Sequence, residues 1–138
     1  MITGASCIIA MMETLAKVAC VAVGGAAGAV TRHLINISPV ASVFEKFPLP
    51  TFLINVTGSF MIGFFLYLLT DKVEVSEGVR MAIIVGFLGA FTTFSTFEME
   101  IYGLIKGGNI GLSGVYLLLS VFIGFAALLA GVALARNL

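Results

Sequence analysis

Long apolar runs separated by short charged clusters dominate the sequence. Four runs of about 20 residues or more cover residues 15–37, 50–70, 79–105 and 110–135. About 20 apolar residues, at a rise of roughly 1.5 Å each, span the hydrocarbon core of a bilayer. Because backbone polar groups must pair internally in lipid, each run is predicted to be a helix. The pattern predicts an all-α integral membrane protein with four transmembrane helices in a single domain, residues 1–138.

Residues 1–12 precede the first predicted span. They lack the basic region that opens a secretory signal peptide, and Glu13 and Lys17 follow them. Translation from Met11 or Met12 would give the first span a more ordinary start. We therefore treat these residues as an N-terminal extension of uncertain status.

Composition agrees with a chain that the bilayer covers. Hydrophobic residues make up 60%, charged residues 10%, and the mean hydropathy is +1.17, whereas about a quarter of the residues in soluble domains are charged. The net charge is zero and no basic patch is present, which argues against nucleic acid as a partner. The composition therefore predicts a multi-pass membrane protein.

The basic residues are almost evenly divided between the two membrane faces. One face, with both termini and residues 71–78, collects Lys17, Lys72, Arg80 and Arg136. The other collects Lys46, Lys106 and, if it lies at a helix end, Arg32. Orientation normally follows a clear excess of Lys and Arg in cytoplasmic loops. Either so short a chain has few charges to distribute, or it inserts in both orientations and assembles as an antiparallel dimer.

Polar residues recur every four positions in the second and fourth runs, so each set shares one helix face. Thr51, Asn55 and Ser59 form the first set, and Tyr116 and Ser120 belong to the second. The Asn55 amide can donate two hydrogen bonds into an aqueous path, or it can join two helices. Tyr116 is open to a second interpretation, as an anchor at the membrane interface.

The third run has an unusual centre. Gly89 is followed by four hydroxyl residues, Thr92, Thr93, Ser95 and Thr96. Glycine weakens a helix, and hydroxyl side chains offer its backbone competing hydrogen bonds. We predict a break near the middle of this helix, where freed carbonyls can coordinate a small cation. The alternative is a continuous helix whose hydroxyls bond back to earlier carbonyls.

Phe94 and Phe97 lie three apart and project from one helix face. The edge of a phenylalanine ring carries partial positive charge, so such rings can line the route of a partly dehydrated anion. Ordinary packing is the alternative. Glu100 follows one turn later, and Arg32 near the end of the first run can snorkel outward or draw anions into a vestibule.

The sequence does not indicate an enzyme. It has one histidine and lacks the HExxH, P-loop and GxSxG patterns. A proton-coupled pump needs a titratable group near the membrane midplane, and the apolar runs offer none there. A passive pathway fits better.

Three stretches resemble the small bacterial fluoride channels of the Fluc or CrcB family. They are Gly24–Ala29 with Arg32, Pro50–Phe52 with Asn55–Phe60, and Gly86–Gly89 with Thr92–Phe97. The first is common in glycine-rich helices, whereas the last two together are specific. The resemblance extends from about Val23 to the C-terminus. It implies a fluoride-selective passive channel of the bacterial cell membrane that exports cytoplasmic fluoride and lowers its toxicity.

The resemblance also implies an antiparallel, dual-topology homodimer with two ion pathways. Asn55 matches the pore asparagine, and Phe94 and Phe97 match the phenylalanines whose edges face the anion. Gly89 and Thr92 fall where family members lend backbone carbonyls to a structural sodium ion at the dimer axis.

A polar track and a vestibule arginine complete what the resemblance implies. The track is matched by Thr51, Glu100, Tyr116 and Ser120, and the vestibule arginine by Arg32. Ala90 and Gly124 depart from the family pattern, where a second glycine and a serine are usual. A small dual-topology multidrug transporter is the alternative, but it needs a carboxylate within its first helix, and Glu13 lies outside that span.

Overall fold

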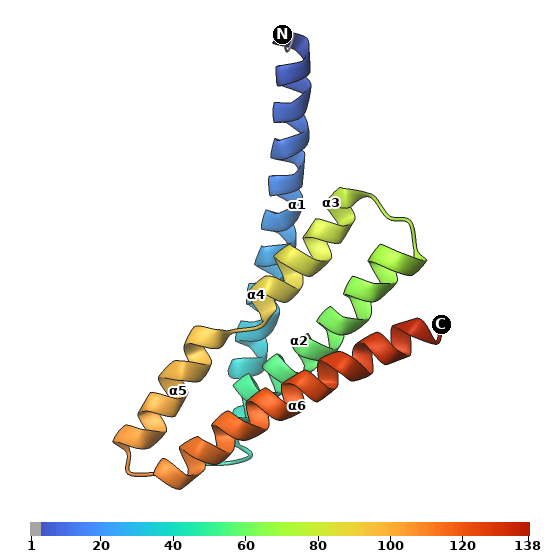
Figure 1. The fold of residues 1–138 in the computed structure, drawn as a ribbon. Coiled ribbons are helices and arrows are strands. Elements are labelled where there is room, and N and C mark those ends of the chain that lie inside the picture. The colour runs from blue at the N-terminus through green and yellow to red at the C-terminus, as the bar shows by residue number, and fades with distance from the viewer. Residues whose placement is uncertain (1–3) are drawn as a thin grey trace.

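The computed structural model describes residues 4–138, with side chains from Ile8 onward. These residues form helices joined by short loops (Figure 1). In chain order the elements are α1 (Gly4–Asn36), η1 (Pro39–Ser42), α2 (Leu49–Tyr67), η2 (Leu68–Lys72), α3 (Glu77–Arg80), η3 (Met81–Leu88), α4 (Gly89–Phe91), α5 (Phe94–Lys106) and α6 (Ile110–Arg136). Element η1 is a 3₁₀ turn, and η2 and η3 are π-helical.

Four helical segments are long and apolar enough to cross a membrane: Ile8–Asn36, Leu49–Lys72, Glu77–Lys106 and Ile110–Arg136. The predicted four-span, all-α architecture is therefore confirmed. Helix α1 starts earlier than the first apolar run suggested, so most of the N-terminal extension is helical. With 33 residues, α1 is about 50 Å long at 1.5 Å per residue, and its N-terminal part projects beyond the other helices (Figure 1).

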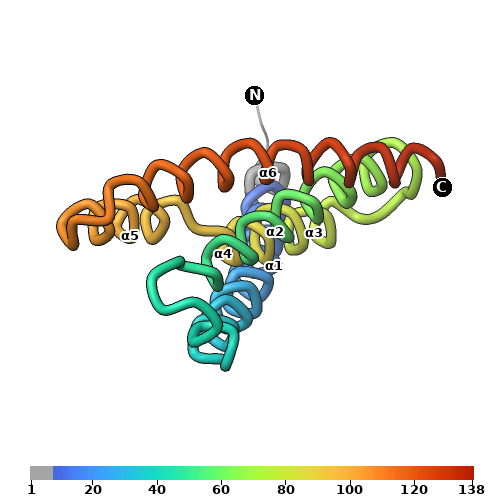
Figure 2. The backbone as a smooth tube through the Cα atoms, turned by 90° about the horizontal axis from the view of Figure 1, so that it is seen from below, coloured from blue at the N-terminus to red at the C-terminus, as the bar shows by residue number. Residues whose placement is uncertain are grey.

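The helices pack in two close pairs. Helix α2 lies along α6, and α1 lies along η3 and α4; α6 and α1 are on opposite sides of the bundle (Figure 2). Glycines permit the first contact, since a Cβ at Gly63 would collide with the Leu128 carbonyl and one at Gly131 with the Phe60 carbonyl. Close approach through small residues is a common way for membrane helices to associate.

Helix α1 meets the π-helical segment with two different residue spacings. A Cβ at Gly24 would collide with the Ala82 carbonyl, and one at Gly28 with the Phe87 carbonyl. The contacts advance four residues along α1 but five along η3. A π-helix pairs residues i and i+5, so positions five apart recur along one side of η3. The two repeats therefore stay in step along the contact.

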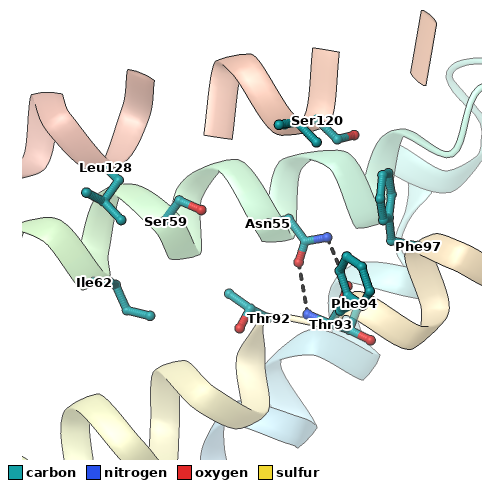
Figure 3. Close-up of a pocket in the computed structure, with 10 residues that line it drawn as sticks. Asn55, Ser59, Ile62, Thr92, Thr93, Phe94, Phe97, Ser120 and Leu128 are labelled. Atoms are coloured by element: carbon teal, nitrogen blue, oxygen red, sulfur yellow. Dashed lines mark hydrogen bonds between the residues drawn. The ribbon is translucent and has the colours of Figure 1, made fainter. Parts of the chain in front are cut away.

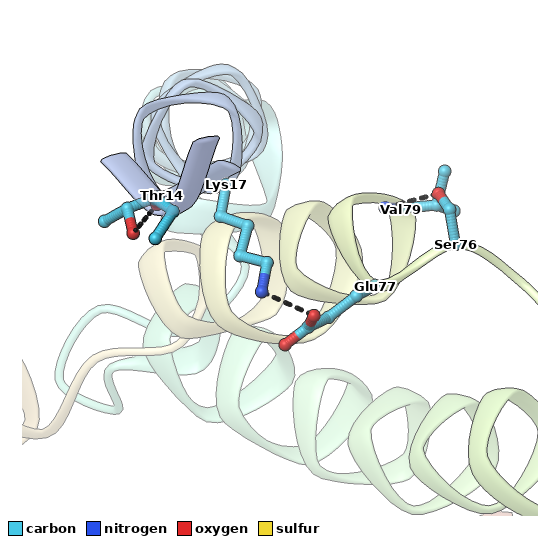
Figure 4. Close-up of polar contacts among 6 residues, drawn as sticks. Thr14, Lys17, Ser76, Glu77 and Val79 are labelled. Atoms are coloured by element: carbon cyan, nitrogen blue, oxygen red, sulfur yellow. Dashed lines mark hydrogen bonds and ion pairs between the residues drawn. The ribbon is translucent and has the colours of Figure 1, made fainter. Parts of the chain in front are cut away.

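An ion pair ties α1 to the start of the third span. The Nζ of Lys17 lies 2.6 Å from a carboxylate oxygen of Glu77 (Figure 4). Glu77 lies in the first turn of α3, where its negative charge interacts favourably with the helix dipole. Ser76 caps that helix, because its side chain accepts from the backbone N–H of Val79. The pair aligns the two helices at one face of the bundle.

The third span is interrupted near its middle, as predicted. Helix α4 ends at Phe91 and α5 begins at Phe94, while Thr92 and Thr93 adopt extended backbone angles. Thr93 then caps α5. The break leaves polar backbone groups at a depth where no lipid can satisfy them, and the side chains that reach them define the candidate site.

Candidate functional site

Asn55 of α2 pairs with the backbone at the break (Figure 3). Its Nδ2 donates to the Thr93 carbonyl at 3.0 Å, and its Oδ1 accepts from the Thr93 N–H at 2.9 Å. This reciprocal pair fixes the orientation of the amide and satisfies two backbone groups that would be costly to leave unpaired. Asn55 thus joins α2 to the third span. The second N–H on its Nδ2 is left for a further acceptor.

Two other contacts hold the break. The Nη1 of Arg32 donates to the Thr92 carbonyl at 3.3 Å. The hydroxyl of Thr93 accepts from the backbone N–H of Thr96 at 3.4 Å and donates to the Thr96 hydroxyl at 2.9 Å. The guanidinium of Arg32 therefore turns inward to the break rather than snorkelling outward.

A cavity of about 280 Å³ opens beside the break (Figure 3). It is lined by Asn55, Ser59, Ile62, Thr92, Thr93, Phe94, Phe97, Ser120, Val121 and Leu128. The lining comes from α2, α5 and α6 as well as the break itself. The structure therefore brings Asn55, Phe94, Phe97 and Ser120, four of the candidate pathway residues, to one cavity whose lining has no charged side chain.

The hydroxyls of this cavity differ in what they bind. The Ser120 Oγ is buried and has no hydrogen-bond partner among the described residues. Ser59 shares the polar face of its helix with Thr51 and Asn55, and it also lines the cavity. A Cβ at Gly124 would lie 3.6 Å from the Ser59 Oγ. Ser59 thus supplies a hydroxyl at the level where Gly124 lacks one.

The two phenylalanines have different surroundings. Their ring centroids are 6.0 Å apart, but Phe97 is 5% exposed whereas Phe94 is 70% exposed. The Phe97 ring meets Tyr116 in an edge arrangement with centroids 5.0 Å apart. Phe97 is therefore fixed by packing, whereas Phe94 presents a large, mostly exposed apolar surface near the middle of the span.

A carboxylate cluster lies one turn beyond Phe97. Glu100 accepts a hydrogen bond from the Thr51 hydroxyl and another from the Tyr116 hydroxyl, each at 2.7 Å. Thr51 and Tyr116 are fully buried, so Tyr116 is not an exposed interfacial anchor. Three helices, α2, α5 and α6, meet at this cluster, which brings together three of the four residues that were expected to form a polar track.

A second cavity, of about 400 Å³, adjoins the cluster. It is lined by Asn36, Ala41, Phe44, Glu45, Lys46, Phe47, Pro48, Pro50, Thr96 and Glu100. Thr96 lines this cavity and its bonded neighbour Thr93 lines the first, so the two spaces adjoin across the start of α5. Sequence reasoning missed the loop before α2, where Phe47 packs edge-on against Tyr116.

The end of α4 fits a cation that binds backbone oxygen. The Thr93 N–H turns to Asn55, so the Gly89 carbonyl lacks the donor that a continuous helix would give it four residues later. A helix C-terminus also carries partial negative charge. The methyl of Ala90 lies toward Gly25 of α1. No cluster of His, Cys, Asp or Glu that could hold a metal occurs among the described residues.

Comparisons with known proteins identify the family. The model of the "CrcB-like protein, Camphor Resistance (CrcB)" family matches residues 19–132. The chain is 39% identical over 122 residues to the fluoride-specific ion channel FluC of Agrobacterium fabrum, covering 88% of this chain and 98% of that one. It is 41% identical over 118 residues to the FluC of Rhizobium etli, covering 86% and 94%.

A third relative, fluoride-specific ion channel FluC 1 of Nitrobacter hamburgensis, is 40% identical over 118 residues, with 86% and 94% of the two chains covered. These relatives are channels rather than enzymes, and they do not favour a multidrug transporter. The family match reaches all four membrane-crossing segments and includes every residue that lines the two cavities. The chain accordingly belongs to the CrcB family.

Proposed function

We propose that this protein is a fluoride-selective passive channel of the bacterial cell membrane, which releases cytoplasmic fluoride and lowers its toxicity. The observation that carries the proposal is the uncharged first cavity, in which an amide, two serine hydroxyls and two phenylalanine rings converge. The names of the relatives support the choice of ion.

Weak-acid chemistry makes a passive channel useful. Hydrogen fluoride is neutral and crosses membranes, and it dissociates in a less acidic cytoplasm, where the anion is trapped. An open path lets the negative-inside potential drive the anion out, with about 2.3 kcal/mol per charge per 100 mV. No coupling to another ion is needed, which agrees with the absence of a charged side chain from the first cavity.

Selectivity requires donors that replace the water around fluoride. In the first cavity, the second N–H of Asn55 and the hydroxyl of Ser120, which has no partner among the described residues, are two such donors. The rings of Phe94 and Phe97 add positive edges. Because the Asn55 amide is held by Thr93, its remaining N–H has a fixed direction, so the donor is preorganised.

The carboxylate cluster serves as the polar track toward the second cavity. Thr51 and Tyr116 both donate to Glu100 in this structure. A fluoride ion at this level must therefore replace the carboxylate as acceptor, and Glu100 must turn away. The second cavity beside Glu100 provides the space for that movement. The exchange of one anionic acceptor for another keeps both hydroxyls satisfied throughout.

The channel is proposed to be an antiparallel homodimer. Phe94 is 70% exposed at the middle of the third span, and it lines the first cavity. A second copy in the opposite orientation would cover Phe94 and close the cavity. The even distribution of basic residues supports insertion in both orientations.

A sodium ion at the dimer axis is the proposed cofactor, with a structural role. The carbonyls of Gly89 and Thr92 from each subunit would supply two of four oxygen ligands. The support is the Gly89 carbonyl, whose helical donor, the Thr93 N–H, turns to Asn55, and the partial negative charge of that helix end. The sodium ion would neutralise two helix ends that otherwise repel each other.

The test is fluoride efflux from liposomes that contain only the purified protein, read with a fluoride electrode. Liposomes loaded with chloride and read with a chloride electrode are the control. We expect rapid fluoride release without chloride release. Folded protein that releases no fluoride would overturn the channel assignment, and equal release of both ions would overturn the selectivity.

A further inference from the structure

Arg32 continues the series of contacts between α1 and the third span. Gly24 meets Ala82 and Gly28 meets Phe87, and four residues after Gly28 and five after Phe87 the next pair is Arg32 and Thr92. The Arg32 Nη1 donates to the Thr92 carbonyl at 3.3 Å. A repeat of four residues on α1 and five on the third span therefore ends at Thr92, the first residue of the break.

The local charges explain why a guanidinium ends this series. The carbonyls at the end of α4 carry partial negative charge and lack helical donors. Arg32 forms no ion pair within residues 8–138, although an arginine in a membrane-spanning helix requires a partner. The guanidinium therefore supplies a donor to the carbonyl, and the carbonyl supplies a partner for the charge. This contact holds the break from α1, as the Asn55 contact holds it from α2.

We propose that Arg32 is a positioning residue. It holds the Thr92 carbonyl from α1 while Asn55 holds Thr93 from α2, and the register between α1 and η3 sets the depth at which it does so. The inference rests on the proposed function, because Thr92 is a proposed sodium ligand and Phe94 follows the held segment by one residue.

A positioning role and an anion-drawing role predict different kinetics. A charge that concentrates fluoride raises the rate only at low fluoride and low ionic strength. Its loss is recovered at saturating fluoride, and lysine replaces it well. A positioning residue affects the maximal rate and the sodium dependence, and lysine replaces it poorly because its shorter side chain carries no planar fork of donors.

The experiment compares Arg32→Lys and Arg32→Met with the wild type in liposomes. Fluoride efflux is measured across a series of fluoride concentrations, and the sodium concentration that gives half-maximal efflux is measured at saturating fluoride. We expect both variants to lose at least tenfold in maximal rate and to shift the half-maximal sodium concentration at least threefold. A wild-type maximal rate in Arg32→Lys would overturn the proposal.

A second pair of variants tests the register without touching the arginine. Gly28→Ala forces α1 away from the Phe87 carbonyl, whereas a Cβ at the adjacent Gly25 meets its nearest neighbours at 3.8–4.0 Å. We expect Gly28→Ala to shift the sodium dependence as the Arg32 variants do, and Gly25→Ala to leave it unchanged. Equal behaviour of the two alanine variants would contradict the register argument.

A readout independent of flux separates this inference from the channel assignment. The midpoint of thermal unfolding is measured in sodium chloride and in N-methylglucamine chloride. We expect sodium to raise the wild-type midpoint and to raise that of Arg32→Met by less than half as much. If the wild type passes no fluoride but this difference persists, the channel proposal fails and the positioning role stands. If sodium raises both midpoints equally, the positioning role fails.

Discussion

The side-chain amide of Asn55 and the backbone of Thr93 bind each other in both directions across the broken third span. The amide works as a missing stretch of helix, since it accepts from one backbone N–H and donates to one backbone carbonyl. A residue that the sequence presents as a pore donor is therefore also a structural support for the break. Both roles depend on one side chain, so a substitution of Asn55 is expected to affect fluoride efflux and stability together.

Asn55→Asp keeps the acceptor for the Thr93 N–H but removes the donor to the Thr93 carbonyl and adds a negative charge beside the cavity. We expect a loss of fluoride efflux of at least tenfold and a loss of about 1–3 kcal/mol in stability. Thr57→Val on the same helix is the control, because the Thr57 hydroxyl is exposed and bonds its own helix. Normal efflux in Asn55→Asp would remove Asn55 from the pathway.

Phe94→Leu and Phe97→Leu test the aromatic edges. Both are expected to lower fluoride efflux at least tenfold, because leucine has no positive ring edge. Phe97→Leu is also expected to reduce the stability of the subunit, by roughly 1 kcal/mol, because Phe97 is packed within its own subunit whereas Phe94 is 70% exposed there. Phe122→Leu, on the exposed face of α6, is the control for both measurements. Unaltered efflux in both variants would sink the pore assignment.

Tyr116→Phe leaves Glu100 with one hydroxyl donor, from Thr51. We expect efflux to fall severalfold, most clearly at low fluoride, because one donor of the polar track is lost. Tyr102→Phe is the matched control, since Tyr102 is 64% exposed. A double-mutant cycle with Glu100→Gln, read by chemical unfolding, is expected to show coupling between the two side chains. Additive effects would mean that the Tyr116–Glu100 bond contributes nothing.

Gly131→Ala should separate α2 from α6, because its Cβ would collide with the Phe60 carbonyl. We expect a destabilisation of about 2 kcal/mol or more, measured by unfolding in detergent. Gly103→Ala is the control, with no heavy atom within 4 Å of its Cβ, and it should be neutral or slightly stabilising. A neutral Gly131→Ala would contradict the close packing of this helix pair.

Dual topology has a direct signature in labelling. In a variant without the native cysteines, Lys46→Cys would place a single thiol in the loop before α2. An impermeant maleimide added outside proteoliposomes should label about half of the protein if the two orientations are equally populated. Lys72→Cys, at the opposite membrane face, should give the same fraction. If one of the two variants is labelled almost completely and the other hardly at all, the protein has one orientation and the antiparallel dimer is excluded.

The spans and the break were predictable because each depends on a local pattern. Apolar runs of membrane length predicted the helices, and Gly89 with the following hydroxyls predicted where the third one stops. The early start of α1 was not predictable in the same way, because Glu13 and Lys17 interrupt the apolar run. Lys17 is accommodated by Glu77 on another helix, and a partner so far along the chain leaves no local signal.

The sequence predicted which candidate residues share a helix face, but not which residues they bind. Spacing placed Thr51 and Asn55 on one side of a helix, yet it did not indicate that one binds Glu100 and the other the backbone of Thr93. The inward turn of Arg32 and the burial of Tyr116 also depend on contacts between helices. The loop residue Phe47, which covers Tyr116, lies outside any helical pattern.

The π-helical geometry of η3 makes the number of residues before the break a determinant of function. Removal of one residue from η3 would leave both neighbouring helices able to form. In α-helical geometry, however, it would rotate everything after it by roughly 100°. The Thr92 carbonyl would then face away from Arg32, and the Thr93 peptide would face away from Asn55. The number of residues in η3 therefore sets the direction in which the backbone groups of the break point.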